Sequence, residues 1–340
     1  MSVVSIVHVQ EGDVEGAVRR GVALAGGWEE AIRPGMRVLV KPNVVGPSPS
    51  GCGNVTDARV TEAVTKMVLE RDPSRVVIGE GSSVGYDFPG RKDTLHCLEV
   101  SGTADVARRL GVELVDLNRD EVVQVHADDA YVMPDFGIAR TAYEADAIID
   151  LPVVKTHIRT GITCGLKNMK GVLPRNEKKR THRMGLDRGI VDLNRVVKLA
   201  YTVADAIMGM EGTHAYPGDC VRLDRVICSA DVVAADAVCA ALMGFDVAQI
   251  HHLMLAAEAG LGVADLEQIS VRGERIADLR RRFVRFQEAA HDRWGAVRII
   301  EKDACTGCMG EMISTFIYLR EAGYGERLAD LTLIMGTPDE

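Results

Sequence analysis

The chain has 340 residues, of which 47% are hydrophobic, 26% charged and only 4% aromatic, and its formal net charge is −9 at pH 7. This length supplies a core without disulfides, and the acidic balance with few aromatic rings excludes nucleic acid as an expected partner. The N-terminus lacks the basic and apolar parts of a secretion signal, and no apolar run reaches membrane-spanning length. We therefore expect a cytoplasmic protein with no membrane partner.

Alternating strand and helix patterns fill the first third of the chain. We expect strands at residues 2–9, 36–40, 76–79 and 112–117, and helices at 14–25, 57–68 and from 103. Thr56 is the expected N-cap of the second helix, with Asp57 in its first turn. This alternation is typical of a mostly parallel sheet with helices on both faces.

The rest of the chain continues the pattern with a short hairpin between residues 118 and 142. Further expected elements are a buried strand at 147–151, a helix at 192–207, a strand at 221–228, a helix from there to 243, a late helix to about 320 and a strand near 331–335. We predict an α/β fold with two Rossmann-like lobes, residues 1–120 and 121–340. The glycines near Gly79 do not fit the G-x-G-x-x-G pattern, so a dinucleotide site is not expected.

The most distinctive stretch follows the buried strand at 147–151 and reads L-P-V-V-K-T-H-I-R-T-G-I-T-C-G-L-K-N-M-K-G-V-L-P. Residues 155–188 contain ten Lys or Arg and only two acids, a local excess of +8 in an acidic protein. Loops at the carboxyl ends of parallel strands form the crevice where ligands bind in open α/β sheets. This charge favours a small anionic substrate, although a solvated basic loop is the alternative.

The predicted anion site draws on several strand ends and on one probable helix start. Imidazole titrates near neutrality, which makes His157 the favoured acid or base, although a lone histidine is more often structural. The candidate catalytic residues are Lys41, Lys155, His157 and Glu211. The candidate substrate-binding residues are Asn43, Lys167, Asn168, Lys170 and His182.

Eight cysteines in a reducing compartment are expected to be thiols or metal ligands. Cys305 and Cys308 form a C-x-x-C pair, which is half of a metal site, and Cys52 and Cys164 lie in glycine-rich loops that could complete it. Four thiolates suit a [4Fe–4S] cluster or tetrahedral zinc; the alternative is that these are small thiols in tight loops. The other four cysteines are expected to be structural.

Short motifs spread over most of the chain resemble the domain of unknown function 362 family. They are K-P-N at Lys41, T-D at Asp57, P-V-V-K-T-H at Pro152, L-K-N-M-K-G at Leu166, M-E-G at Met210, S-A-D-V-V-A-A-D at Ser229 and M-G-F at Met243. The resemblance implies an α/β protein from a family that includes iron–sulfur proteins, many with a ferredoxin segment of repeated C-x-x-C spacing. This chain has a single pair, so any cluster would use scattered cysteines.

The favoured hypothesis is an iron–sulfur oxidoreductase that holds a [4Fe–4S] cluster beside a basic cleft and acts on a small anionic substrate. The first alternative is a non-redox dehydratase or isomerase in which a three-cysteine cluster acts as a Lewis acid. The others are an electron-transfer or binding protein that docks a redox partner protein, and a protein with structural zinc.

Overall fold

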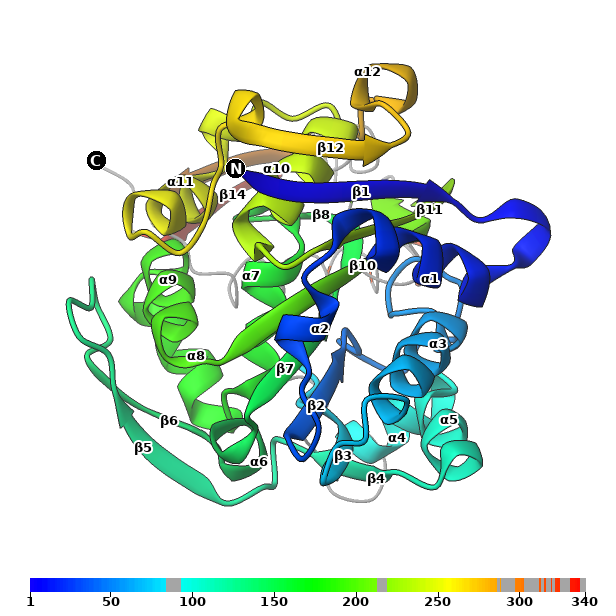
Figure 1. Cartoon of the computed structure of the whole chain (residues 1–340). Helices are drawn as coiled ribbons and strands as arrows, with labels where there is room; N and C mark the ends of the chain where they lie inside the picture. Colours follow the sequence, from blue (N-terminus) through cyan, green and yellow to red (C-terminus); the bar gives the residue numbers. More distant parts are fainter. Residues whose placement is uncertain are drawn as a thin grey trace.

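The computed structural model describes residues 1–83, 93–212, 219–285, 288, 297–302, 312, 315, 319, 322–324 and 331–336. Its centre is a ten-stranded, mostly parallel sheet in the order β12-β1-β11-β10-β7-β2-β3-β4, with β8 beside β10 and β9 beside β8 (Figure 1). The strands are β1 (Ser2–His8), β2 (Arg37–Pro42), β3 (Arg75–Glu80), β4 (Glu113–Asp116), β7 (Ala147–Leu151), β8 (Val153–His157), β9 (Gly161–Thr163), β10 (Leu199–Glu211), β11 (Asp219–Ser229) and β12 (Ile269–Gly273).

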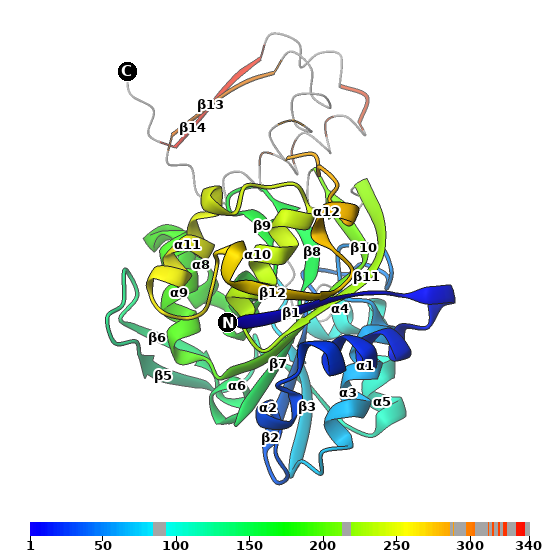
Figure 2. The ribbon, with the colours of Figure 1, turned by 45° about the horizontal axis from the view of Figure 1, so that its top comes forward.

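Helices cover both faces of this sheet, as Figures 1 and 2 show. On one face pack α1 (Val14–Ala25), α2 (Trp28–Ala31), α3 (Ala58–Leu69) and α5 (Thr103–Leu110). On the other pack α7 (Gly165–Asn168), α9 (Leu186–Val196), α10 (Val232–Leu242) and α11 (His251–Glu258). The remaining helices are α4 (Thr94–Val100), α6 (Arg140–Glu144), α8 (Arg175–Met184) and α12 (Ile276–Leu279).

Strand side chains alternate between the two hydrophobic cores because successive residues point to opposite faces. In β1, Val4 and Ile6 join the core under α10, whereas Val7 joins the core under α1. In β10, Val203 and Ala204 divide in the same way. Burial on both faces explains why the sheet strands are apolar almost throughout.

The predicted α/β fold with a mostly parallel sheet and helices on both faces is confirmed. The predicted hairpin is also present, as β5 (Val122–His126) paired antiparallel with β6 (Asp135–Ala139). A second small sheet pairs β13 (Arg298–Lys302) with β14 (Thr332–Gly336). The division into lobes at residue 120 stays a prediction, but strands from both ranges share the large sheet.

Two local predictions were wrong. The helix expected at 192–207 ends at Val196, and β10 begins at Leu199 in the middle of the sheet. Residues 201–207 of this strand are all buried, and an apolar run without a polar face does not distinguish a central strand from a buried helix. The N-cap of α3 is Asp57, whose side chain accepts from Arg59 N, while Thr56 Oγ1 donates to Leu151 O.

Candidate functional site

Three neighbouring parallel strands bring charged side chains to one edge of the sheet. Lys41 of β2 lies opposite Asp150 of β7, and β3 on the other side of β2 ends at Glu80. All three side chains are buried, with relative exposures of 0% for Lys41 and Asp150 and 2% for Glu80. This is the edge where the loops of an open α/β sheet leave a crevice for ligands.

Lys41 and Glu80 form a buried ion pair, with Nζ and Oε2 2.7 Å apart. Glu80 also accepts from Gly81 N at 2.7 Å, which helps to compensate for its loss of hydration. Gly171 covers the pair so closely that a Cβ there would lie 1.9 Å from Glu80 Oε1. Because a side chain at position 171 would displace the ion pair, a glycine is required there. The carboxylate of Glu80, the only one on β3, is already neutralised by Lys41.

A chain of buried hydrogen bonds links the strand ends to α7. Lys155 Nζ donates to Asn43 Oδ1 at 2.9 Å and to Asn54 O at 2.6 Å. Asn43 donates to Asn168 Oδ1 at 2.7 Å, and Asn168 donates to Asp150 Oδ1 at 2.7 Å. These hydrogen bonds fix both asparagine side chains. They also bring together residues that are more than one hundred positions apart in the sequence.

Helix α8 contributes a lysine and a histidine one turn apart. Lys178 donates to Gly81 O at 2.7 Å and also to the Asn118 side chain. Lys170, from the turn before α8, lies with Nζ 2.8 Å from His182 Nε2. Positions i and i+4 share a helix face, so Lys178 and His182 both point toward the strand ends.

These groups enclose a cavity of about 130 Å³. Its lining includes the ammonium groups of Lys167, Lys170 and Lys178, the carboxylate of Glu80 and the amides of Asn43 and Asn168. Within the described residues the Lys167 ammonium has no hydrogen bond or ion pair to another side chain. Lys167 is therefore a positive charge at the cavity that has no ion pair among the described residues.

Burial and mutual repulsion depress the basicity of this wall. Burial, and then the charge of Lys41, lower the pKa of Lys167 to about 8. Burial, and then Lys167 and Lys178, hold the pKa of Lys170 well below its usual range. The pKa of His182 falls to about 2 through burial and the neighbouring lysines, so its ring is neutral and accepts from Lys170. A bound anion would raise the pKa values of all three groups toward their usual ranges.

The pKa values of Lys155 and Asp150 are also shifted, and each shift favours the neutral form of the side chain. Burial, followed by the charge of Lys167, lowers the pKa of Lys155 to about 7, and burial holds the pKa of Asp150 well above its usual range. Clusters of groups with such displaced pKa values are characteristic of functional sites.

The structure thus brings together seven of the nine residues predicted for the anion site: Lys41, Asn43, Lys155, Lys167, Asn168, Lys170 and His182. His157 lies apart, where its Nδ1 accepts from Arg159 N and Thr160 N at 3.2 Å. Glu211 also lies apart, with contacts to Arg281 Nη2 at 3.1 Å and Val284 N at 2.9 Å. Their present contacts order turns, and their catalytic roles stay predictions.

Two residues of the cavity were missed by sequence reasoning, Glu80 and Lys178. Glu80 ends a strand immediately before Gly81, which is the signal that singled out the other strand-end residues. Lys178 is concealed in the basic run of α8, where only its spacing of four residues from His182 marks it. Lys179, the next residue, is exposed.

Of the predicted metal ligands, Cys305 and Cys308 lie outside the described residues. Cys52 is half-buried, and Cys220 Sγ lies 3.0 Å from its carbonyl oxygen. Cys164 is fully buried, and its contact with the Cys239 thiol, with burial and nearby carboxylates, raises its pKa well above the usual range. These surroundings favour a neutral thiol at Cys164. Within the described parts of the chain, no three His, Cys, Asp or Glu side chains gather as a metal site.

The fold and the site define an α/β protein with a lysine-lined cavity at the carboxyl ends of its central strands. The profile of the domain of unknown function 362 (DUF362) matches residues 38–241, and the chain belongs to this family. The matched range includes every residue that lines the cavity.

Two further comparisons place the chain among known proteins. It is 26% identical over 260 residues to the thylakoid-associated protein sll1697 of Synechocystis sp. (strain ATCC 27184 / PCC 6803 / Kazusa), covering 75% of this chain and 77% of that protein. A solved structure, the lactate racemase apoprotein from Thermoanaerobacterium thermosaccharolyticum, is similar with a TM-score of 0.38 and 13% identity. That match covers 68% of this chain and 55% of the racemase, and so spans little more than half of it. Among the described residues, no helix is long and apolar enough to cross a bilayer.

Proposed function

We propose that this protein is an enzyme that binds a small anionic substrate, a carboxylate or a phosphate, in the lysine-lined cavity. The observation that carries the proposal is the Lys167 ammonium, which faces the cavity without an ionic partner among the described residues. Lys167 is partly buried, and a partly desolvated charge is normally paired because leaving it unpaired costs folding free energy. A ligand that supplies the missing negative charge accounts for that cost.

The chemistry that this wall can perform follows from its pKa values. Lys167 would hold the anionic group of the substrate through a charge-assisted hydrogen bond, with Lys170 as a second donor. Lys167, with a pKa of about 8, exchanges a proton near neutral pH and would act as the general acid or base. The neutral His182 keeps Lys170 oriented by accepting its hydrogen bond.

Calorimetric titration with inorganic phosphate and with acetate tests the proposal. We expect one site per chain, and a loss of affinity of about 10- to 100-fold in Lys167→Met, since a charge-assisted hydrogen bond contributes about 1.5–3 kcal/mol. Lys179→Met is the matched control, because Lys179 lies on α8 but is exposed. Equal affinities in the two variants, or no binding of either anion to the unaltered protein, would refute the proposal.

The cofactor remains part of the proposal through the C-x-x-C of the sequence. A [4Fe–4S] cluster would supply electrons for redox chemistry on the bound anion, and zinc is the alternative metal. Cys52, Cys305 and Cys308 are the proposed thiolate ligands. Cys164 fits this role least because its thiol is enclosed with that of Cys239.

Anaerobic purification followed by iron, zinc and acid-labile sulfide analysis tests this part separately. We expect iron and sulfide to be lost in Cys52→Ala, Cys305→Ala and Cys308→Ala, and kept in Cys239→Ala. Retention of the metal in Cys164→Ala supports a three-cysteine cluster and its non-redox Lewis-acid alternative, whereas its loss supports four ligands. Failure to find iron and sulfide would remove the cluster and leave the anion cavity untouched.

A further inference from the structure

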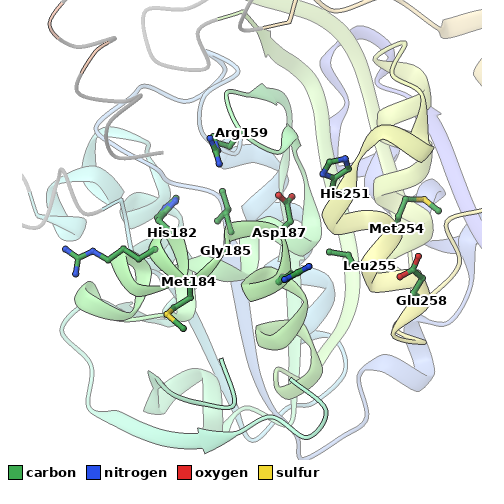
Figure 3. A pocket seen from close by; sticks show the side chains of 12 residues that line it. Arg159, His182, Met184, Gly185, Asp187, His251, Met254, Leu255 and Glu258 are labelled. Atoms are coloured by element: carbon green, nitrogen blue, oxygen red, sulfur yellow. The ribbon is translucent and has the colours of Figure 1, made fainter. Parts of the chain in front are cut away.

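A second, larger depression adjoins the lysine-lined cavity. It is a groove of about 800 Å³ between the α8–α9 junction and α11. Figure 3 shows His182 and Met184 on the α8 side, and His251, Met254 and Glu258 on the α11 side. His182 lines both the groove and the cavity, so this side chain is part of the wall of each space.

The two spaces differ in size and in lining. The cavity of about 130 Å³ accommodates one compact anionic group, whereas 800 Å³ is within the usual range for sites that bury a whole small molecule. The cavity wall carries three lysines, while the groove combines ionisable side chains with the apolar side chains of Met184, Leu186, Met254 and Leu255. A ligand that fills both spaces therefore has a charged end and an apolar body.

The groove lining favours an aliphatic body over an aromatic one. Among the described residues, no Phe, Tyr or Trp lines it, so it offers no ring for stacking a nucleobase. Its methionines are flexible and polarizable, which suits a chain of variable conformation. Met184 is 47% exposed, so its side chain is accessible to a ligand in the groove.

Charged groups form the rim of the groove. Arg159, Arg188 and His251 are exposed there, and Asp187 and Glu258 balance part of their charge. These charged groups keep the groove hydrated beside its apolar side chains, and the lysines of the cavity attract the charged end of a ligand.

We infer that the substrate is a single-chain amphipathic anion, whose charged end occupies the lysine-lined cavity and whose aliphatic body lies in the groove beyond His182. This inference rests on the proposed function and names the substrate class for that same site. A carboxylate or phosphate monoester at the end of an alkyl chain has the required chemistry.

Titration with inorganic phosphate and then with methyl, butyl and octyl phosphate below their micellar concentrations tests the inference. We expect the dissociation constant to fall roughly fourfold for each methylene that enters the groove, because burial of a methylene contributes about 0.8 kcal/mol. Met254→Ser and Met184→Ser should each reduce this gain, and the exposed Met184 provides a variant that does not disturb the core. Leu266→Ser, at an exposed leucine outside the groove, is the matched control.

The outcomes separate this inference from the proposed function. Binding of phosphate with no gain from chain length, or a gain that survives both methionine substitutions, overturns the groove assignment and leaves the anion cavity standing. Absence of binding by every compound overturns both. Sedimentation with phosphatidylcholine vesicles that contain lysophosphatidic acid would assign the substrate to a membrane lipid, and binding of octyl phosphate without sedimentation would assign it to a free ester.

Discussion

The buried carboxylate of Asp192 and the partly buried ammonium of Lys167 have different surroundings in this molecule. Asp192 is fully buried, yet it accepts from Tyr131 N, Val132 N and Met133 N at 2.7–2.9 Å. Asp236 likewise accepts from the first backbone N–H groups of α7. Lys167 faces a cavity with no comparable partner among the described residues. Burial alone therefore does not mark a functional charge, whereas an unneutralised charge next to a cavity does.

Removal of the best-satisfied carboxylate should have the largest effect on stability. Asp192→Ala leaves three buried backbone N–H groups without acceptors, so we expect the free energy of unfolding to fall by about 3 kcal/mol. Chemical denaturation measures this change, with the exposed Asp128→Ala as control. The affinity of the folded protein for phosphate should stay the same. A loss of affinity at unchanged stability would instead give Asp192 a role in anion binding.

The opposite substitution on the lysine side should stabilise the protein. Lys167→Met replaces a partly buried, unpaired charge with an apolar side chain of similar length, so we expect the free energy of unfolding to rise by about 1 kcal/mol while anion affinity falls about 10- to 100-fold. Denaturation without added anions tests it. A lower stability than that of Lys179→Met would show that Lys167 is structural.

The pH dependence of stability provides a finer test of the same comparison. The pKa of Lys155 is about 7 and that of Lys167 about 8 in the folded protein, against 10.5 ordinarily. Between these values the unfolded chain binds more protons, so these groups make the unfolding free energy increase from about pH 7 to pH 10. Lys167→Met should reduce the slope, and phosphate affinity should decrease as pH rises through about 8. Identical slopes in both proteins would contradict the assigned pKa.

The smallest effect is expected at Glu211. Arg281 is about half exposed, with 51% of its side chain accessible, so the ion pair to Glu211 is partly screened. Glu211→Gln should lower the free energy of unfolding by about 0.5 kcal/mol. The affinity for phosphate and the turnover of any identified substrate should not change. A large loss of turnover at normal stability would restore the catalytic role predicted from the sequence.

The region of the cavity could be predicted from the sequence because its polar residues follow recognisable apolar strands. Lys41, Asn43 and Lys155 follow apolar strands, and parallel strands place such residues at one edge whatever the strand order. The strand order itself was not accessible, because β10 reads as an apolar helix until its neighbours are known. The partner of Lys41 was also hidden, since the pairing with Glu80 depends on β2 and β3 being adjacent.

The cysteines show where such reasoning ends. Cys52 and Cys164 both have glycine neighbours in loops, yet one is half-buried at the surface and the other lies in the core against Cys239. Local sequence does not encode this difference, because it arises from the packing of α7 against α10.

The most direct test of the anion cavity is a crystal structure after soaking with selenate, whose selenium scatters anomalously. We expect a selenium peak within hydrogen-bonding reach of the Lys167 and Lys170 ammonium groups in the unaltered protein, and none at this place in Lys167→Met. A cavity that stays free of selenate at saturating concentration, with both lysines turned to protein acceptors, would contradict the central claim.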